Sequence, residues 1–157
     1  MRPRIMRAAL AALAVLVVSV AGAGTAAAQV LVASERNLDF GQITPGVATV
    51  VAPTDLIRSA QLRIDGRGTY QVSFQLPAQL TSPAGHTIPL VFGADAGLLT
   101  IRRKVTSFDP STTTSFRINP AEREAQLNLG GQAMPAAAQM AGFYSATIVV
   151  MVVQTGT

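Results

Sequence analysis

The sequence predicts an all-β fold, an antiparallel β-sandwich built as a single domain. Short runs of alternating apolar and polar residues recur along the chain, and Gly, Pro, Ser and Asn stand between them. Short strands separated by such turn residues are typical of an antiparallel sandwich. The chain has no cysteine, so no disulfide supports it and a single hydrophobic core must hold the fold.

The N-terminal segment has the pattern of a secretory signal peptide. Residues 1–7 contain three arginines and no acid, and residues 8–22 form an apolar run. Ala26-Ala27-Ala28 then supplies the small residues of a cleavage site. A basic start, a short apolar run and an A-x-A site together predict export and cleavage. We therefore expect residues 1–28 to be removed and residues 29–157 to form one domain.

Charge argues against a nucleic-acid partner. Removing the three N-terminal arginines from the twelve basic residues leaves nine against eight acids, a net charge of +1. Nucleic-acid binding depends on neutralising phosphates, which a near-neutral protein does poorly. We interpret the basic cluster Arg102-Arg103-Lys104 as a solvated turn or sheet edge. After cleavage we expect no stable insertion into a membrane.

The first half of the domain carries three strand signals. Leu62–Ile64 alternates apolar and polar residues, and so does Tyr70–Leu76. Asp65–Gly68, between them, is rich in residues that tolerate turns, which predicts a hairpin. Pro89 interrupts the apolar run Thr87–Phe92. Because proline lacks the N–H that a ladder needs, this segment is expected to be an edge strand or a bulge.

The second half continues the alternation. Phe116–Ile118 and Leu127–Leu129 are short alternating runs, and Gly130-Gly131 is expected to form a turn after the second. Asn119–Glu122 has a cap, a proline and an acid in helix-start order, and Pro135–Ala141 is rich in alanine. Both are expected to be no more than helical turns within loops.

Catalytic, cofactor and metal sites are not expected. His86 is the only histidine and lies in a predicted loop, so it cannot form a multi-histidine metal site. The aspartates Asp65, Asp95 and Asp109 precede Gly, Ala and Pro, as turn residues do. The D-x-D-x-D-G spacing of a calcium loop is missing, and so are a G-x-S-x-G elbow, a P-loop and a dinucleotide fingerprint.

Both tyrosines are expected in the core. Tyr70 and Tyr144 occupy positions that read as strand, and buried aromatic side chains supply much of the energy of a core. The chain has no tryptophan, which weighs against a carbohydrate site built from exposed aromatic rings.

Four blocks of sequence, taken together, carry a family resemblance. In order they are "LDFGQITPG" (Leu38–Gly46), "ATVVAP" (Ala48–Pro53), "GTYQVSFQLP" (Gly68–Pro77) and "LNLGGQAM…AGFYSATIVVMV", which ends at Val153. The set resembles the domain-of-unknown-function 4402 family (DUF4402), exported bacterial proteins related in pattern to spore coat protein U and to chaperone–usher pilins. The resemblance spans residues 38–153 and implies an immunoglobulin-like sandwich of the fimbrial type. It implies no reaction.

The C-terminal segment raises the question of what covers it. Ile148–Val153 is apolar throughout, and Tyr144–Val153 is expected to be one central strand covered on both faces. An exposed, uncharged β-rich segment is an aggregation hazard. We therefore expect Ile148–Val153 in the interior of a sheet, paired on at least one side within the chain. The resemblance implies an alternative, a groove beside the last strand that a neighbour's N-terminal extension fills. The chain closing its own sheet is favoured, because the stretch before Leu38 is a short donor.

Three function classes follow. The favoured one is a non-enzymatic exported structural or surface subunit, pilin-like or coat-like, in the periplasm or at the cell surface. Its partners would be other protein subunits or a periplasmic chaperone, bound by β-strand addition. The second is a monomeric periplasmic or extracellular binding module that uses its loops. A hydrolase without a recognisable motif ranks last.

Overall fold

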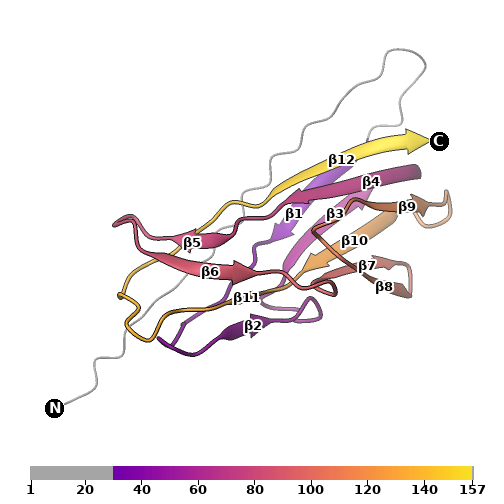
Figure 1. The fold of residues 1–157 in the computed structure, drawn as a ribbon. Coiled ribbons are helices and arrows are strands. Elements are labelled where there is room, and N and C mark those ends of the chain that lie inside the picture. Colours follow the sequence, from indigo (N-terminus) through magenta and orange to yellow (C-terminus); the bar gives the residue numbers. More distant parts are fainter. Residues whose placement is uncertain (1–29, 157) are drawn as a thin grey trace.

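The computed structural model describes residues 30–156, and these residues form β-strands, turns and loops without a helix (Figure 1). The predicted signal peptide and its cleavage site lie outside the described residues. The strands in chain order are β1 (Leu31–Arg36), β2 (Thr49–Val51), β3 (Ala60–Asp65), β4 (Gly68–Gln75), β5 (Gln79–Thr81), β6 (Thr87–Val91), β7 (Gly97–Ile101), β8 (Lys104–Phe108), β9 (Thr114–Ile118), β10 (Glu124–Leu129), β11 (Gly131–Ala133) and β12 (Val149–Gly156).

The strands form three antiparallel sheets. Their orders are β1-β3-β10-β7-β8, β2-β11-β6-β5 and β12-β4-β9. The all-β antiparallel prediction is therefore confirmed. Figure 1 shows β12 and β4 side by side along one long side of the molecule.

All three sheets contribute to one hydrophobic core. The five-stranded sheet supplies Leu62, Ile64 and Leu127, the three-stranded sheet Tyr70, Val72 and Ile118, and the four-stranded sheet Val51, Ile88 and Ala133. The alternation predicted for β3, β4 and β9 agrees with burial of every second side chain at their centres. In β10 Leu127 and Leu129 are buried as predicted, but Asn128 between them is buried as well. Phe74, at the margin of this core, stacks on Phe108 with ring centroids 5.9 Å apart.

The predicted hairpin at Asp65–Gly68 is wrong. β3 pairs with β1 and β10, whereas β4 pairs with β12 and β9. The link carries the chain from the five-stranded sheet to the three-stranded sheet. Ile64 and Tyr70 therefore enter the same core from two different sheets, which a hairpin within one sheet would not allow.

Gly130-Gly131 is not a turn either. Gly131 begins β11, and Gly130 alone joins the five-stranded sheet to the four-stranded sheet. A Cβ at Gly130 would lie 2.3 Å from the carbonyl oxygen of Val51. Glycine is needed here because the backbone passes so close to β2.

The edge prediction for Pro89 is also wrong. β6 lies between β5 and β11, and its register with β5 runs without a bulge. The carbonyl of Pro89 accepts a hydrogen bond from the N–H of Met134, just past the end of β11. In an antiparallel strand a residue's N–H and C=O point to the same side. An N–H at position 89 would therefore point towards the segment just past β11, where that strand has already ended.

The two segments with helix-like signals are single turns, as expected. The N–H of Glu122 donates to the Asn119 carbonyl at 2.8 Å, and the Glu122 carboxylate accepts from the Asn119 N–H at 3.0 Å. Strand β10 then begins at Glu124. In the second segment the N–H of Gln139 donates to the Ala136 carbonyl.

Candidate functional site

The single histidine and the basic cluster do not form a site. His86 is exposed in the loop between β5 and β6, where its backbone N–H donates to Ser82 Oγ at 3.0 Å. Arg102 and Arg103 are exposed in the turn between β7 and β8. Within residues 30–156 no group of His, Asp and Glu side chains is placed to hold a metal ion. That part of the chain also contains no helix able to cross a membrane.

The three aspartates that were predicted to lie in turns are found at strand ends or in the segments between strands. Asp95 is in the turn before β7, and Asp109 bonds the N–H and hydroxyl of Ser111. The hydroxyl and N–H of Ser111 lower the pKa of Asp109 below its usual value. Asp65 is the last residue of β3 and forms an ion pair with Arg63. The prediction that Asp65 lies in a turn is therefore wrong.

Both tyrosines are in the core, as predicted, although only one lies in a strand. Tyr70 in β4 is fully buried, and its hydroxyl donates to the Arg67 carbonyl at 3.0 Å. Burial raises the pKa of Tyr70. Tyr144 lies before β12, where its hydroxyl donates to the Met140 carbonyl and accepts from Gln139.

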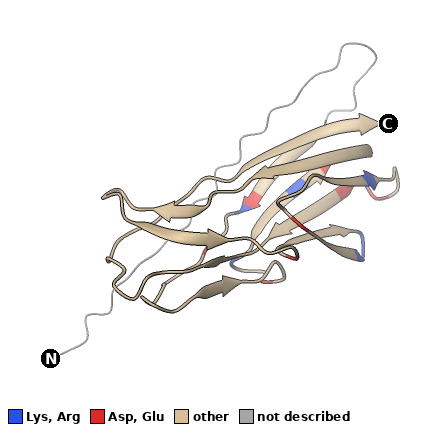
Figure 2. Cartoon of the chain, in the orientation of Figure 1, with Lys and Arg blue, Asp and Glu red and all other residues tan. Residues whose placement is uncertain are grey.

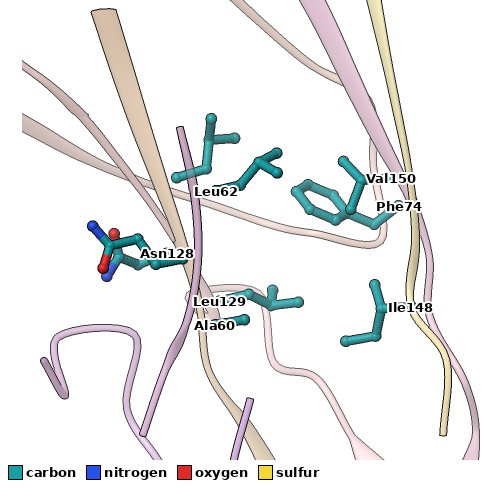
Figure 3. Close-up of a pocket in the computed structure, with 9 residues that line it drawn as sticks. Ala60, Leu62, Phe74, Asn128, Leu129, Ile148 and Val150 are labelled. Carbon is teal, nitrogen blue, oxygen red and sulfur yellow. The ribbon is translucent and has the colours of Figure 1, made fainter. Parts of the chain in front are cut away.

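The core holds a cavity beside β12 that is too small for a substrate. Its volume is about 20 Å³, which is room for a single water molecule. Figure 3 shows Ala60, Leu62 and Leu129 facing Phe74, Ile148 and Val150 across it, while the Asn128 amide points away. The Asn128 amide instead donates to Ser59 Oγ at 3.3 Å. Ligand pockets for small molecules are an order of magnitude larger.

The C-terminal strand is the most unusual feature of the surface. β12 pairs with β4, from Val149 opposite Gln75 to Gly156 opposite Thr69, which confirms that this segment is paired on at least one side within the chain. Two predictions are wrong for the described residues, because β12 is an edge strand. Ile148–Val153 does not lie in the interior of a sheet, and the chain does not close this sheet itself. Among residues 30–156 no strand pairs with the other side of β12.

The two faces of β12 differ in burial. Val150 and Val152 are buried in the core, whereas Met151 is 42% exposed and Val149 and Val153 are half-buried. The strand begins at Val149. The prediction that Tyr144–Val153 is one continuous strand covered on both faces is therefore wrong. Valine favours the extended, half-buried backbone of a strand, which explains why this run is a strand even at an edge.

Natural proteins usually protect sheet edges with charges, proline, bulges or short strands. In the described chain the other edges follow this rule. β2 and β5 have three residues each, β8 begins with Lys104, β9 contains Arg117, and β1 contains Glu35 and Arg36 beside a bulge.

β12 has eight residues with no charge and no proline, and its register shifts only at Gln154–Gly156. Figure 2 shows no charged residue on β12, β4, β5 or β6. No Asp, Glu, Lys or Arg follows Glu124 in the sequence. We call β12 from Val149 to Val153 the unprotected edge.

Known proteins do not identify the chain. Neither a family model nor a curated protein matches this sequence. Two surface features of the described residues point to a function: the unprotected edge and a loop after β2.

This loop presents two exposed apolar side chains on a fixed backbone. Leu56 and Ile57 are 76% and 82% exposed. Arg36 donates hydrogen bonds to the carbonyls of Leu56 and Ser59. Asp55 accepts hydrogen bonds from the backbone N–H groups of Ile57 and Arg58, both at 3.0 Å. Arg36 and Asp55 therefore hold both ends of the turn, and no signal in the sequence had pointed to this loop.

Proposed function

We propose that this chain is a non-enzymatic exported structural or surface subunit, pilin-like or coat-like, which assembles by β-strand addition at β12. The unprotected edge is the observation that carries the proposal. A long, flat, uncharged edge is a template for another strand, and strand addition is a common mode of recognition. The partners are other protein subunits or a periplasmic chaperone, and the location is the periplasm or the cell surface.

The proposal also includes a fold that is more specific than the all-β class. An immunoglobulin-like sandwich of the fimbrial type is supported by the antiparallel sheets around one core and by the resemblance over residues 38–153. In such domains the last strand borders the site of strand addition, and in this chain the last strand, β12, is an edge.

Hydrogen exchange of the β12 amides tests the proposal. In a strand paired on one side, every second N–H lacks a ladder partner. An eight-residue peptide of alternating valine and threonine should add to the edge and slow exchange of those alternate amides between Val149 and Gly156. A control peptide with proline at its centre cannot complete the ladder and should protect them much less. Unchanged exchange at β12 with both peptides would rule out strand addition there.

The loop at Leu56 and Ile57 favours a second candidate, a monomeric binding module. Apolar side chains that are largely exposed on a fixed turn lose little conformational freedom when a partner covers them. Binding of the labelled protein to cell-envelope material distinguishes the two functions. Loss of binding in Leu56→Ser/Ile57→Ser, with binding retained in Met151→Lys, would favour the loop; the reverse result would favour the edge.

A further inference from the structure

The unprotected edge has a sequence that is the same in both directions. Val149-Val150-Met151-Val152-Val153 reads identically from either end, with Met151 at its centre. Two antiparallel strands pair residues in opposite order. A second β12 placed against the first would therefore find valine opposite valine and methionine opposite methionine at five successive positions.

We propose that β12 pairs with β12 of a second copy of this chain, antiparallel and centred on Met151. The proposal rests on the proposed function, because it names the occupant of the same edge. Val149 would lie opposite Val153 of the copy, and Val150 opposite Val152. The two three-stranded sheets would become one continuous sheet across a two-fold axis.

Charge favours a second copy as the occupant. A two-fold contact brings the same patch of both copies together, so an edge whose charges share one sign would repel its copy. β12 carries no charged residue, and neither does β4, its neighbour in the same sheet. On the outer face the exposed Met151 and the half-buried Val149 and Val153 would form one apolar row with their counterparts. Apolar and β-branched pairs opposite each other stabilise a sheet.

The pairing also closes the assembly. Both unprotected edges are used in the dimer, and the other edges of the described chain are short or carry charge. Centred on Met151, the two β12 strands overlap from Val149 to Val153, a strip about 17 Å long and about 10 Å deep, on the order of 170 Å² per partner. Stable interfaces bury about 800 Å² per partner, so the dimer should be weak and should depend on protein concentration.

Cysteine cross-linking tests the register, because the natural chain has no cysteine and a single introduced one can link only two copies. Met151→Cys should give a disulfide-linked dimer under mild oxidation, since opposed residues lie within the Cα–Cα range of a disulfide. Val149→Cys and Val153→Cys should each link poorly alone. Mixed together they should link well, because each lies opposite the other. Gln71→Cys, on the exposed outer face of β4, is the control and should not link.

Sedimentation of variants that carry opposite charges at position 151 tests the association independently of cross-linking. Met151→Lys and Met151→Glu should each sediment as a monomer at concentrations where the natural chain associates, because like charges would meet at the axis. Mixing the two variants should restore the dimer. Gln71→Lys should associate like the natural chain. Circular dichroism confirms that each variant is folded.

Three results would overturn the proposal. The first is equal cross-linking at Val149, Met151 and Gln71, which would indicate random collision. The second is association that Met151→Lys leaves unchanged. The third is a chain that stays monomeric while the valine–threonine peptide protects β12; this would leave strand addition intact and assign the edge to a different protein. A monomer that also ignores the peptide would remove the proposed function as well.

Discussion

The hydroxyl of Tyr70 occupies the space where a side chain on Gly66 would begin. A Cβ built on Gly66 would lie 2.4 Å from that oxygen, which donates to the Arg67 carbonyl at 3.0 Å. This contact fixes the link through which the chain passes from β3 to β4, between two sheets. The glycine is required by this close approach.

Gly66→Ala should therefore destabilise the protein. Overpacking a tight site costs about 1–3 kcal/mol, and urea unfolding measures it. Gly93→Ala is the matched control, because nothing lies within 4 Å of its added methyl group. Adding Tyr70→Phe to Gly66→Ala should remove most of the clash, since the next atom of the ring is 3.4 Å from the Cβ. If the double variant lost stability additively, the Tyr70 hydroxyl would not be the cause.

Lysine substitutions on the two faces of β12 should have unequal effects. Val150 is 3% exposed and Met151 is 42% exposed. Val150→Lys buries a charge without a partner and should cost several kcal/mol in urea unfolding. Met151→Lys should change the free energy of unfolding of the monomer by less than about 1 kcal/mol. Similar losses for both would show that β12 does not present the two faces described.

Phe74→Ala tests the stack between the sheets. Phe74 packs at the margin of the core against Phe108, so its loss should cost about 3 kcal/mol, the lower end of the range for buried phenylalanine. Ser73→Ala, on the outer face of the same strand, should cost under about 0.5 kcal/mol. Thermal and urea unfolding compare the two, and equal costs would contradict the burial pattern of β4.

The loop after β2 should respond to acid. Hydrogen bonds from the backbone N–H groups of Arg58 and Ile57, and then from the Arg58 side chain, lower the pKa of Asp55. Because the folded pKa is depressed, the contribution of Asp55 is present above its unfolded pKa of about 3.9. That contribution is lost as the pH falls through the folded value.

Carboxyl NMR titration measures this shift. Arg58→Gln should raise the pKa of Asp55 only part of the way, because the backbone N–H groups remain. A return to the ordinary value in that variant would mean that the Arg58 side chain, and not the turn, dominates.

Processing can be checked directly on exported protein. The basic start, the apolar run over residues 8–22 and the small residues before Gln29 predict cleavage after Ala28. Mass spectrometry should find Gln29 at the N-terminus. A product that retains residues 8–22 would contradict the signal-peptide interpretation.

The sequence alone determined which residues face the core in the central strands. Alternation in Leu62–Ile64, Tyr70–Val72, Phe116–Ile118 and Leu127–Leu129 was sufficient, because successive side chains of a strand point to opposite faces whatever its neighbours are. The turn chemistry of Asn119–Glu122 was equally local.

Only the tertiary structure decided which strands are neighbours. β4 follows β3 after two residues, yet it pairs with β12 and β9, far along the chain. The glycines at positions 66 and 130 indicated that the backbone could bend there, but not which sheet the chain would enter next. The edge position of β12 was hidden for the same reason. Its valines alternate between buried and half-exposed faces only because β4 pairs with one side and the core lies under one face, and both partners come from distant parts of the sequence.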